Sequence, residues 1–193
     1  MKSNPKSIPI ERYIAIDIHK LYVVVGGMNS QKEWVLRTRK VRMSLFPEWA
    51  QKNLLPTDAV VIESTSNAWE IYDLIAPLAG YVVVANPLKV GQIAGAKVKT
   101  DKLDVERLIT LLIAGIVPEV WVPPHHVRDL RALISHRWRI HKQISMTKNR
   151  LHSFIHRFNL IPPEGKLFSE ENRSWWQQQD FSSMVRLQIE QDL

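Results

Sequence analysis

Four acidic residues could together carry out metal-dependent chemistry on a phosphate ester. Asp17 lies within a run of β-branched residues, and Glu63 ends a continuous apolar run. Asp101 and Asp104 lie three residues apart at the start of a helical pattern, so one helix face would present both. Four carboxylates form an all-oxygen ligand set, which suits Mg²⁺ or Mn²⁺ rather than Zn²⁺. Such ions can activate a nucleophile and stabilise the leaving oxygen in phosphoryl transfer.

Each of these acids taken alone has an ordinary structural explanation. An acid inside a strand commonly pairs with a lysine or lies on an exposed edge, because a buried charge needs a partner. Asp101 and Asp104 are flanked by lysines and by Arg107, which would make a solvated helix start held by surface ion pairs. The order of all four acids along the chain favours a shared site with catalytic and metal-binding roles over these separate explanations.

The secondary-structure elements that must position the acids follow a defined order. Alternating and β-branched runs predict strands at 13–19, 21–27, 33–39, 59–64, 81–85 and 120–122, with helices at 44–55 and 68–76 and from 101 onward. The first three strands form an antiparallel meander, and β-α-β units follow it. This is the element order of an RNase H-like α/β fold, a mixed sheet with flanking helices. In such a sheet the first and fourth strands can be neighbours, which would bring Asp17 beside Glu63.

Several local features of this interpretation can be tested directly by a structure. Ser44 is predicted to cap the helix at 44–55, with Leu45, Trp49 and Leu54 facing inward. The small-residue stretch 91–96 is assigned no element, and Thr100 is expected to cap the helix that begins at Asp101.

The second half of the chain changes character after the proline pair at 123–124. Residues 127–158 contain neither Gly nor Pro and predict one helix of about 30 residues, far above the mean helix length. Its apolar residues keep a rough heptad spacing, which indicates a coiled coil or a dimerisation arm and hence a homo-oligomer. We therefore expect two domains, the RNase H-like domain at 8–124 and a helical arm at 125–193.

The chain is basic, with a formal net charge of +7 and a sequence pI of about 9.7. Such a charge favours binding to polyanions such as nucleic acid or an anionic membrane surface. Residues 128–157 hold eight Lys and Arg against one acid, which indicates a nucleic-acid footprint, although a charge run is often only a solvated face. The basic residues predicted to contact nucleic acid are Lys97, Lys99, Lys102, Arg131, Arg137, Arg139, Lys142, Lys148, Arg150 and Arg157.

The composition excludes several other classes of protein. Without cysteine the chain has no disulfide, thiolate zinc site or cysteine nucleophile. The start of the sequence is polar and lacks the apolar core of a secretion signal, and no apolar run reaches the ~20 residues of a membrane span. We expect a cytoplasmic protein with no membrane partner.

Two further residues could take part in binding. His19 could contact a phosphate near Asp17, but a histidine beside a strand is more commonly a half-buried surface residue. Trp138 could stack on a base. Packing in a core or a dimer is the more ordinary use of its large apolar surface.

A set of short motifs gives the chain a family resemblance. These are AIDIHK (15–20), VIEST (61–65), ANP (85–87), KTDKLD (99–104), VWVPP (120–124) and KNRLH (148–152). Together they resemble the N-terminal part of the DEDD-type insertion-sequence transposases, a group with a RuvC-like domain that includes the bridge-RNA-guided recombinases. The resemblance implies that Asp17, Glu63, Asp101 and Asp104 are the four acids that give the group its name. It also implies Mg²⁺ or Mn²⁺ as cofactor, DNA as a partner, and a structured guide RNA as a further partner.

One departure from the family pattern bears on what this chain does alone. Family members carry a further C-terminal domain with a serine that attacks DNA, and no stretch here matches it. We therefore expect the N-terminal portion of a DNA transposase or recombinase, incomplete by itself for full strand exchange. The alternatives are a metal-dependent nuclease or Holliday-junction resolvase with this fold, and a non-catalytic nucleic-acid-binding module.

Overall fold

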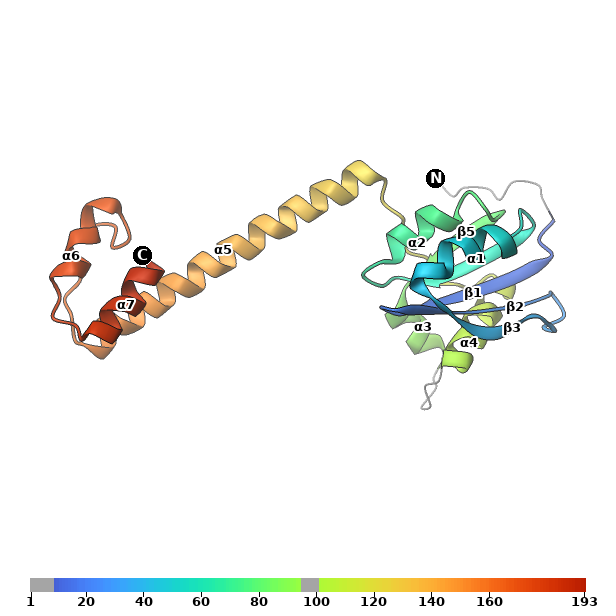
Figure 1. The fold of residues 1–193 in the computed structure, drawn as a ribbon, viewed down its shortest axis with the longest axis horizontal. Helices are drawn as coiled ribbons and strands as arrows, with labels where there is room; N and C mark the ends of the chain where they lie inside the picture. The colour runs from blue at the N-terminus through green and yellow to red at the C-terminus, as the bar shows by residue number, and fades with distance from the viewer. Residues whose placement is uncertain (1–8, 95–100) are drawn as a thin grey trace. The chain divides into compact units, whose positions relative to one another are not determined.

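The described part of the chain divides into two units. The computed structural model describes residues 9–94 and 101–193, and it separates into the units Met1–Val122 and Pro123–Leu193 (Figure 1). Lys97, Lys99 and Thr100 lie outside the described residues, as do residues 95 and 96 of the small-residue stretch.

The first unit is built on a five-stranded mixed sheet with the strand order β3-β2-β1-β4-β5. The strands are β1 (Arg12–Ile18), β2 (Tyr22–Met28), β3 (Trp34–Arg42), β4 (Asp58–Glu63) and β5 (Tyr81–Ala85). β1 pairs antiparallel with β2 and parallel with β4, and β4 pairs parallel with β5. The predicted mixed sheet and the adjacency of the first and fourth strands are confirmed.

Helices cover both faces of this sheet (Figure 1). They are α1 (Phe46–Asn53), α2 (Ala68–Ile75), α3 (Pro87–Ala94) and α4 (Asp101–Ile113), and a 3-10 turn at Met43–Leu45 precedes α1. Ile14, Ile16 and Ile62 are buried against α1 and α2, whereas Ala15 and Val61 are buried in a second cluster with α4. Successive side chains of a strand alternate between faces, so Asp17 and Glu63 belong to the face that α4 covers.

The second unit contains the predicted long helix and a small helical cap. The long helix α5 spans His125–Arg157, close to the predicted 127–158. It is followed by a 3-10 turn at Glu170–Asn172, α6 (Arg173–Gln178) and α7 (Ser183–Asp192). A separate apolar cluster joins the end of α5 to this cap through Leu151, Ile155, Trp176, Phe181 and Ile189.

The predicted strand at 120–122 is wrong. In its place Glu119 forms an isolated antiparallel bridge with Ala85, and the Val120 N–H donates to the carbonyl of Val84 at 2.8 Å. Prolines at 118, 123 and 124 bracket this segment and have no N–H to donate, which prevents a longer ladder.

A helix occupies part of the stretch 91–96, for which the sequence predicts no element. Asn86 and Pro87 begin α3, because the Asn86 side-chain oxygen accepts from the N–H groups of Leu88 (3.0 Å) and Lys89 (3.3 Å). Proline is also well suited to the first helical position. This capping signal was present in the sequence, but Gly91 in mid-segment obscured it.

The start of the first helix also differs from the prediction. Ser44 lies in the 3-10 turn and caps nothing, and α1 begins two residues later, at Phe46. Pro47 has no N–H, and the first turn of this shorter helix accommodates it. As a result Phe46 is fully buried while Leu45 is 54% exposed, whereas Trp49 and Leu54 face inward as predicted.

Candidate metal centre

The sheet register places two of the predicted acids side by side. Ile16 of β1 pairs with Ile62 of β4, so Asp17 and Glu63 occupy the next position on each parallel strand. Both strands end at this edge of the sheet, because Glu63 is the last residue of β4 and Ile18 the last of β1.

The other two acids come from the first turn of α4. This helix packs on β1, β2 and β4 through its buried residues, which are Val105, Leu108, Ile109, Leu111 and Leu112. Gly26 allows the close approach, because a Cβ at that position would lie 2.8 Å from Val105 Cγ1. Asp101 and Asp104 are thereby held at the same edge of the sheet as Asp17.

One cavity of about 300 Å³ collects all four predicted acids. Its lining residues are Asp17, His19, Glu63, Pro87, Val90, Gly91, Asp101, Asp104 and Arg107. The sheet edge and α4 supply the charged groups, and α3 supplies the remaining wall. The sequence predicts no helix in this region, so α3 was not expected to contribute to the site.

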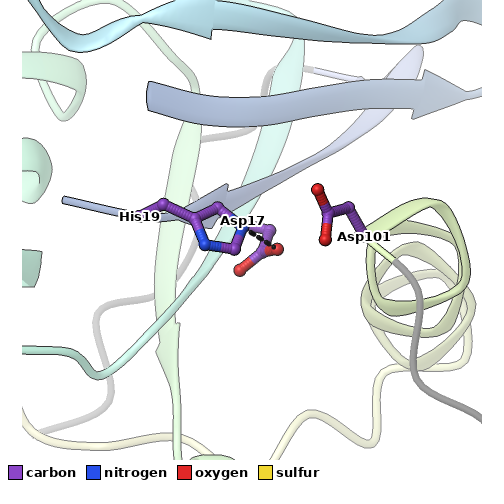
Figure 2. A group of neighbouring side chains, drawn as sticks. All are labelled: Asp17, His19 and Asp101. Carbon is purple, nitrogen blue, oxygen red and sulfur yellow. Dashed lines mark hydrogen bonds and ion pairs between the residues drawn. The ribbon is translucent and has the colours of Figure 1, made fainter. Parts of the chain in front are cut away.

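The tightest group within this cavity is Asp17, His19 and Asp101. One ligand atom from each lies within 4.8 Å of the others (Figure 2). His19 Nε2 is 2.9 Å from Asp17 Oδ2, and Figure 2 shows the Asp101 carboxylate reaching toward this pair from the start of its helix.

Two cationic side chains offset the negative charge of the cluster. Lys40 Nζ, from β3, lies 3.0 Å from Asp101 Oδ2, and this hydrogen bond lowers the pKa of the Asp101 carboxyl from its ordinary value. The same contact raises the pKa of Lys40. Arg107 donates to Asp104 Oδ1 at 3.3 Å. Lys40 was missed in the sequence because it lies on a strand far from the acids along the chain.

The fold disfavours the ionised form of Asp17. Burial raises the pKa of its carboxyl, and the charges of Asp104 and Asp101 raise it further, whereas His19 opposes the rise. A carboxyl whose pKa is higher in the folded than in the unfolded protein contributes its full stabilisation at pH values below the unfolded-state pKa. That contribution is lost as the pH rises through the folded pKa. At neutral pH, therefore, ionised Asp17 destabilises the metal-free fold.

Asp17→Asn is expected to make the metal-free chain more stable at pH 7, by about 0.5–2 kcal/mol. The amide removes the buried charge, and its oxygen can still accept a hydrogen bond from His19. The difference in free energy of unfolding between the variant and the wild type should narrow as the pH falls toward the ordinary carboxyl pKa, where the wild-type side chain is also neutral. Urea denaturation in chelator at several pH values measures this difference, and a less stable variant at pH 7 would contradict it.

The donor set fits a hard divalent cation. Four carboxylates line the cavity of about 300 Å³, which leaves room for an ion with bound waters, each of which occupies roughly 30 Å³ in the liquid. Among the described residues, the group close enough to share one ion is Asp17, His19 and Asp101, and it does not include Glu63 or Asp104. The mutual repulsion of the acids, which is part of what raises the pKa of Asp17, is the repulsion that a cation relieves.

The described basic residues fall into different environments. Lys102 is exposed on α4, and Arg131, Arg137, Arg139 and Lys142 are exposed along α5. Arg150 instead holds Asp192 with contacts of 2.9 and 2.6 Å, so its charge is already compensated. Lys148 Nζ lies 5.4 Å from the Phe168 ring centre, and Arg157 Cζ lies 5.6 Å from that of Phe158.

The fold and the acid-lined cavity define the class to which this unit belongs. A mixed sheet in the order 3-2-1-4-5, with helices on both faces and carboxylates where β1 and β4 end, is an RNase H-like domain. Residues 14–159 match the family model of the IS110-type DEDD transposases. The chain belongs to this transposase family.

A comparison with curated proteins points the same way. The chain is 26% identical over 119 residues to the Sinorhizobium fredii protein named "Putative transposase y4qE". The match covers 62% of this chain but only 30% of that relative, so the chain spans about a third of its length. Among the helices in the described ranges, none is both long and apolar enough to cross a lipid bilayer.

Proposed function

We propose that this chain is the N-terminal, metal-binding and DNA-binding portion of a transposase that acts on insertion-sequence DNA in the cytoplasm. The observation that carries the proposal is that Asp17, Glu63, Asp101 and Asp104 line one cavity at the end of the sheet. Family membership supports DNA strand transfer as the reaction that such a cavity serves.

The residues around the cavity divide the work between them. The four carboxylates would hold Mg²⁺ or Mn²⁺, and a bound ion would supply Lewis-acid activation for phosphoryl transfer. Lys40 and Arg107 place positive charge beside the acids, where it limits their repulsion and attracts a DNA phosphate. Pro87, Val90 and Gly91 of α3 form the remaining wall of the cavity beside the carboxylates.

Calorimetric titration of the chain with MnCl₂ and with MgCl₂ tests the metal site. Saturable binding is expected for the wild type, and at least tenfold weaker binding for Asp101→Asn, because one charged ligand is lost. Asp129→Asn is a matched control, since Asp129 lies on α5 in the other unit. Identical titrations for the wild type and for Asp101→Asn would reject these acids as ligands.

We also propose that the basic side of α5 contacts nucleic acid. Ile134, Arg137, Trp138, His141 and Lys142 border one hollow on this helix, and Trp138 is 71% exposed. Exposed cations beside an exposed aromatic ring suit a phosphate backbone with a base stacked on the ring. Both DNA and a structured guide RNA are candidates for this surface.

Replacing Arg131, Arg139 and Lys142, which lie outside the heptad positions of Leu133 and Ile140, by glutamate should weaken duplex DNA binding at least tenfold and flatten its salt dependence. Each phosphate contact contributes about −0.9 to the slope of log K against log salt, so losing three should reduce the slope by roughly 3. Fluorescence anisotropy between 50 and 300 mM salt, with a structured RNA as competitor, measures both effects. Lys52→Glu on α1 is the control, because its ammonium already pairs with Glu48 at 2.7 Å. An unchanged slope would remove these three residues from the interface.

An apolar stripe on α5 supports self-association of the arm. Leu130, Leu133, Ile140 and Ile144 are all more than 40% exposed and follow heptad spacing. The same spacing continues into the buried Leu151 of the cap cluster. Burying such a seam against a second copy of α5 would form a two-stranded coiled coil.

Leu133→Glu combined with Ile140→Glu is expected to convert a dimer into a monomer. Two charges at the seam would have to be buried without partners, which costs several kcal/mol. Light scattering after gel filtration should then give 22.4 kDa instead of twice that mass. Ser135→Glu, on the opposite side of the heptad, should leave the dimer intact. A wild-type chain that is monomeric at micromolar concentration would contradict the proposal.

A further inference from the structure

We propose that His19 is an additional ligand of the metal and that its imidazole nitrogen makes the site select Mn²⁺ over Mg²⁺. This inference rests on the proposed metal site and adds to it a ligand and a metal preference. It comes from the position of His19 among the acids, because His19 borders the same cavity as all four of them.

The distances within the group suit shared coordination. Two neighbouring ligands of an octahedral ion, each about 2.1 Å from the metal, lie about 3.0 Å apart. His19 Nε2 and Asp17 Oδ2 are 2.9 Å apart, and an Asp101 oxygen lies within 4.8 Å of both. A single ion can therefore contact the histidine and both carboxylates after a small adjustment of the Asp101 side chain.

Tyr22 contacts both the backbone and the imidazole ring of His19. The His19 backbone N–H donates to the Tyr22 carbonyl at 2.9 Å, which closes the turn between β1 and β2. The His19 ring stacks on the Tyr22 ring, with centroids 4.4 Å apart and planes 25° apart. Lys40 Nζ lies 4.4 Å from the centre of the same tyrosine ring and ion-pairs with Asp101. Tyr22 thus restrains the ring. Nε2 of that ring lies beside the Asp17 carboxylate (Figure 2).

A nitrogen ligand distinguishes between Mn²⁺ and Mg²⁺. Mg²⁺ favours oxygen ligands and keeps several of its waters, so an imidazole adds little to its binding. Mn²⁺ shares with Mg²⁺ a preference for carboxylates and water, but as a transition-metal ion it accepts an imidazole nitrogen more readily than the harder Mg²⁺ does. Coordination needs the Nε2 lone pair, so the ring carries its proton on Nδ1, and the shared cation replaces the Nε2–Oδ2 hydrogen bond.

Pulsed electron paramagnetic resonance on the Mn²⁺-loaded full chain tests this inference directly. Nitrogen-14 modulation from a coordinated imidazole is expected in the wild type and in His152→Asn, whose histidine lies on α5. His19→Asn should lose the modulation. Calorimetry should show about tenfold weaker Mn²⁺ binding for His19→Asn, with Mg²⁺ affinity changed less than twofold. Should His19→Asn fail to fold, labelling the wild-type histidines with nitrogen-15 should still shift the modulation frequency.

The possible failures separate the two proposals. Tight Mn²⁺ binding without nitrogen modulation would overturn the role of His19 while the carboxylate site stands. Equal losses of Mn²⁺ and Mg²⁺ affinity in His19→Asn would also overturn it, because His19 would then only position Asp17. No saturable binding of either ion would instead reject the proposed metal site itself.

Discussion

Replacing Asp17 by Asn and Glu63 by Gln together is expected to abolish the stabilisation that Mn²⁺ gives the wild-type chain. A ligand that binds only the folded state stabilises it by about 2.7 kcal/mol when present at 100 times its dissociation constant. The double variant keeps the size and shape of both side chains but removes two carboxylate charges from adjacent strands. Thermal unfolding in Mn²⁺ and in chelator measures the difference for each protein.

The two proteins should also differ in unfolding temperature without metal, and this makes the experiment more discriminating. The double variant should unfold at a higher temperature than the wild type in chelator, because burial of Asp17 disfavours its charged form. Adding Mn²⁺ should then stabilise only the wild type. Glu48→Gln is a control, since Glu48 lies on α1 and pairs with Lys52. A double variant stabilised by Mn²⁺ as strongly as the wild type would place the metal elsewhere.

Arg12→Ala is expected to lower the free energy of unfolding by about 3–5 kcal/mol, the usual cost of leaving a buried charge without its partner. Asp58 is completely buried at the start of β4, and Arg12 of β1 meets both of its carboxylate oxygens at 2.7 Å. The Leu55 N–H also donates to Asp58 at 2.8 Å. The Asp58 carboxylate is thus part of what pairs β1 with β4, the strands that carry Asp17 and Glu63.

A double replacement distinguishes the cost of losing the whole Arg12–Asp58 ion pair from the cost of losing one partner. Arg12→Met with Asp58→Leu removes both charges, so much of the lost stability should return, because an apolar pair can substitute for a buried ion pair. Urea denaturation of the three proteins gives the comparison. A loss below about 1 kcal/mol in Arg12→Ala would show that solvent reaches Asp58 and that this pair contributes little.

Much of the sheet was predictable because its signals are local. The β-branched runs gave each main strand to within a few residues, and a meander followed by β-α-β units left few possible strand orders. Side chains alternate between the two faces along a strand, so the sequence alone indicates that Asp17 and Glu63 share a face of the sheet. The spacing of Asp101 and Asp104 needed only helical geometry.

The parts that were not predictable depend on contacts between distant segments. Lys40 reaches Asp101 only after β3 and α4 have packed, and Arg12 meets Asp58 across 46 residues of chain. The role of α3 as a wall was missed for a local reason, since its glycine concealed a capping signal. The sequence leaves His19 between a phosphate contact and a half-buried residue beside a strand, because nothing along the chain shows that Tyr22 holds its ring beside Asp17.

The most direct test of the metal centre is a crystal structure of the chain grown with Mn²⁺ and measured for anomalous scattering. We expect at least one anomalous peak inside the cavity of about 300 Å³, at bonding distance from carboxylate oxygens of Asp17 and Asp101. A cavity without a peak while Mn²⁺ occupies other sites, or Asp17 and Glu63 on opposite faces of the sheet, would contradict the proposed site.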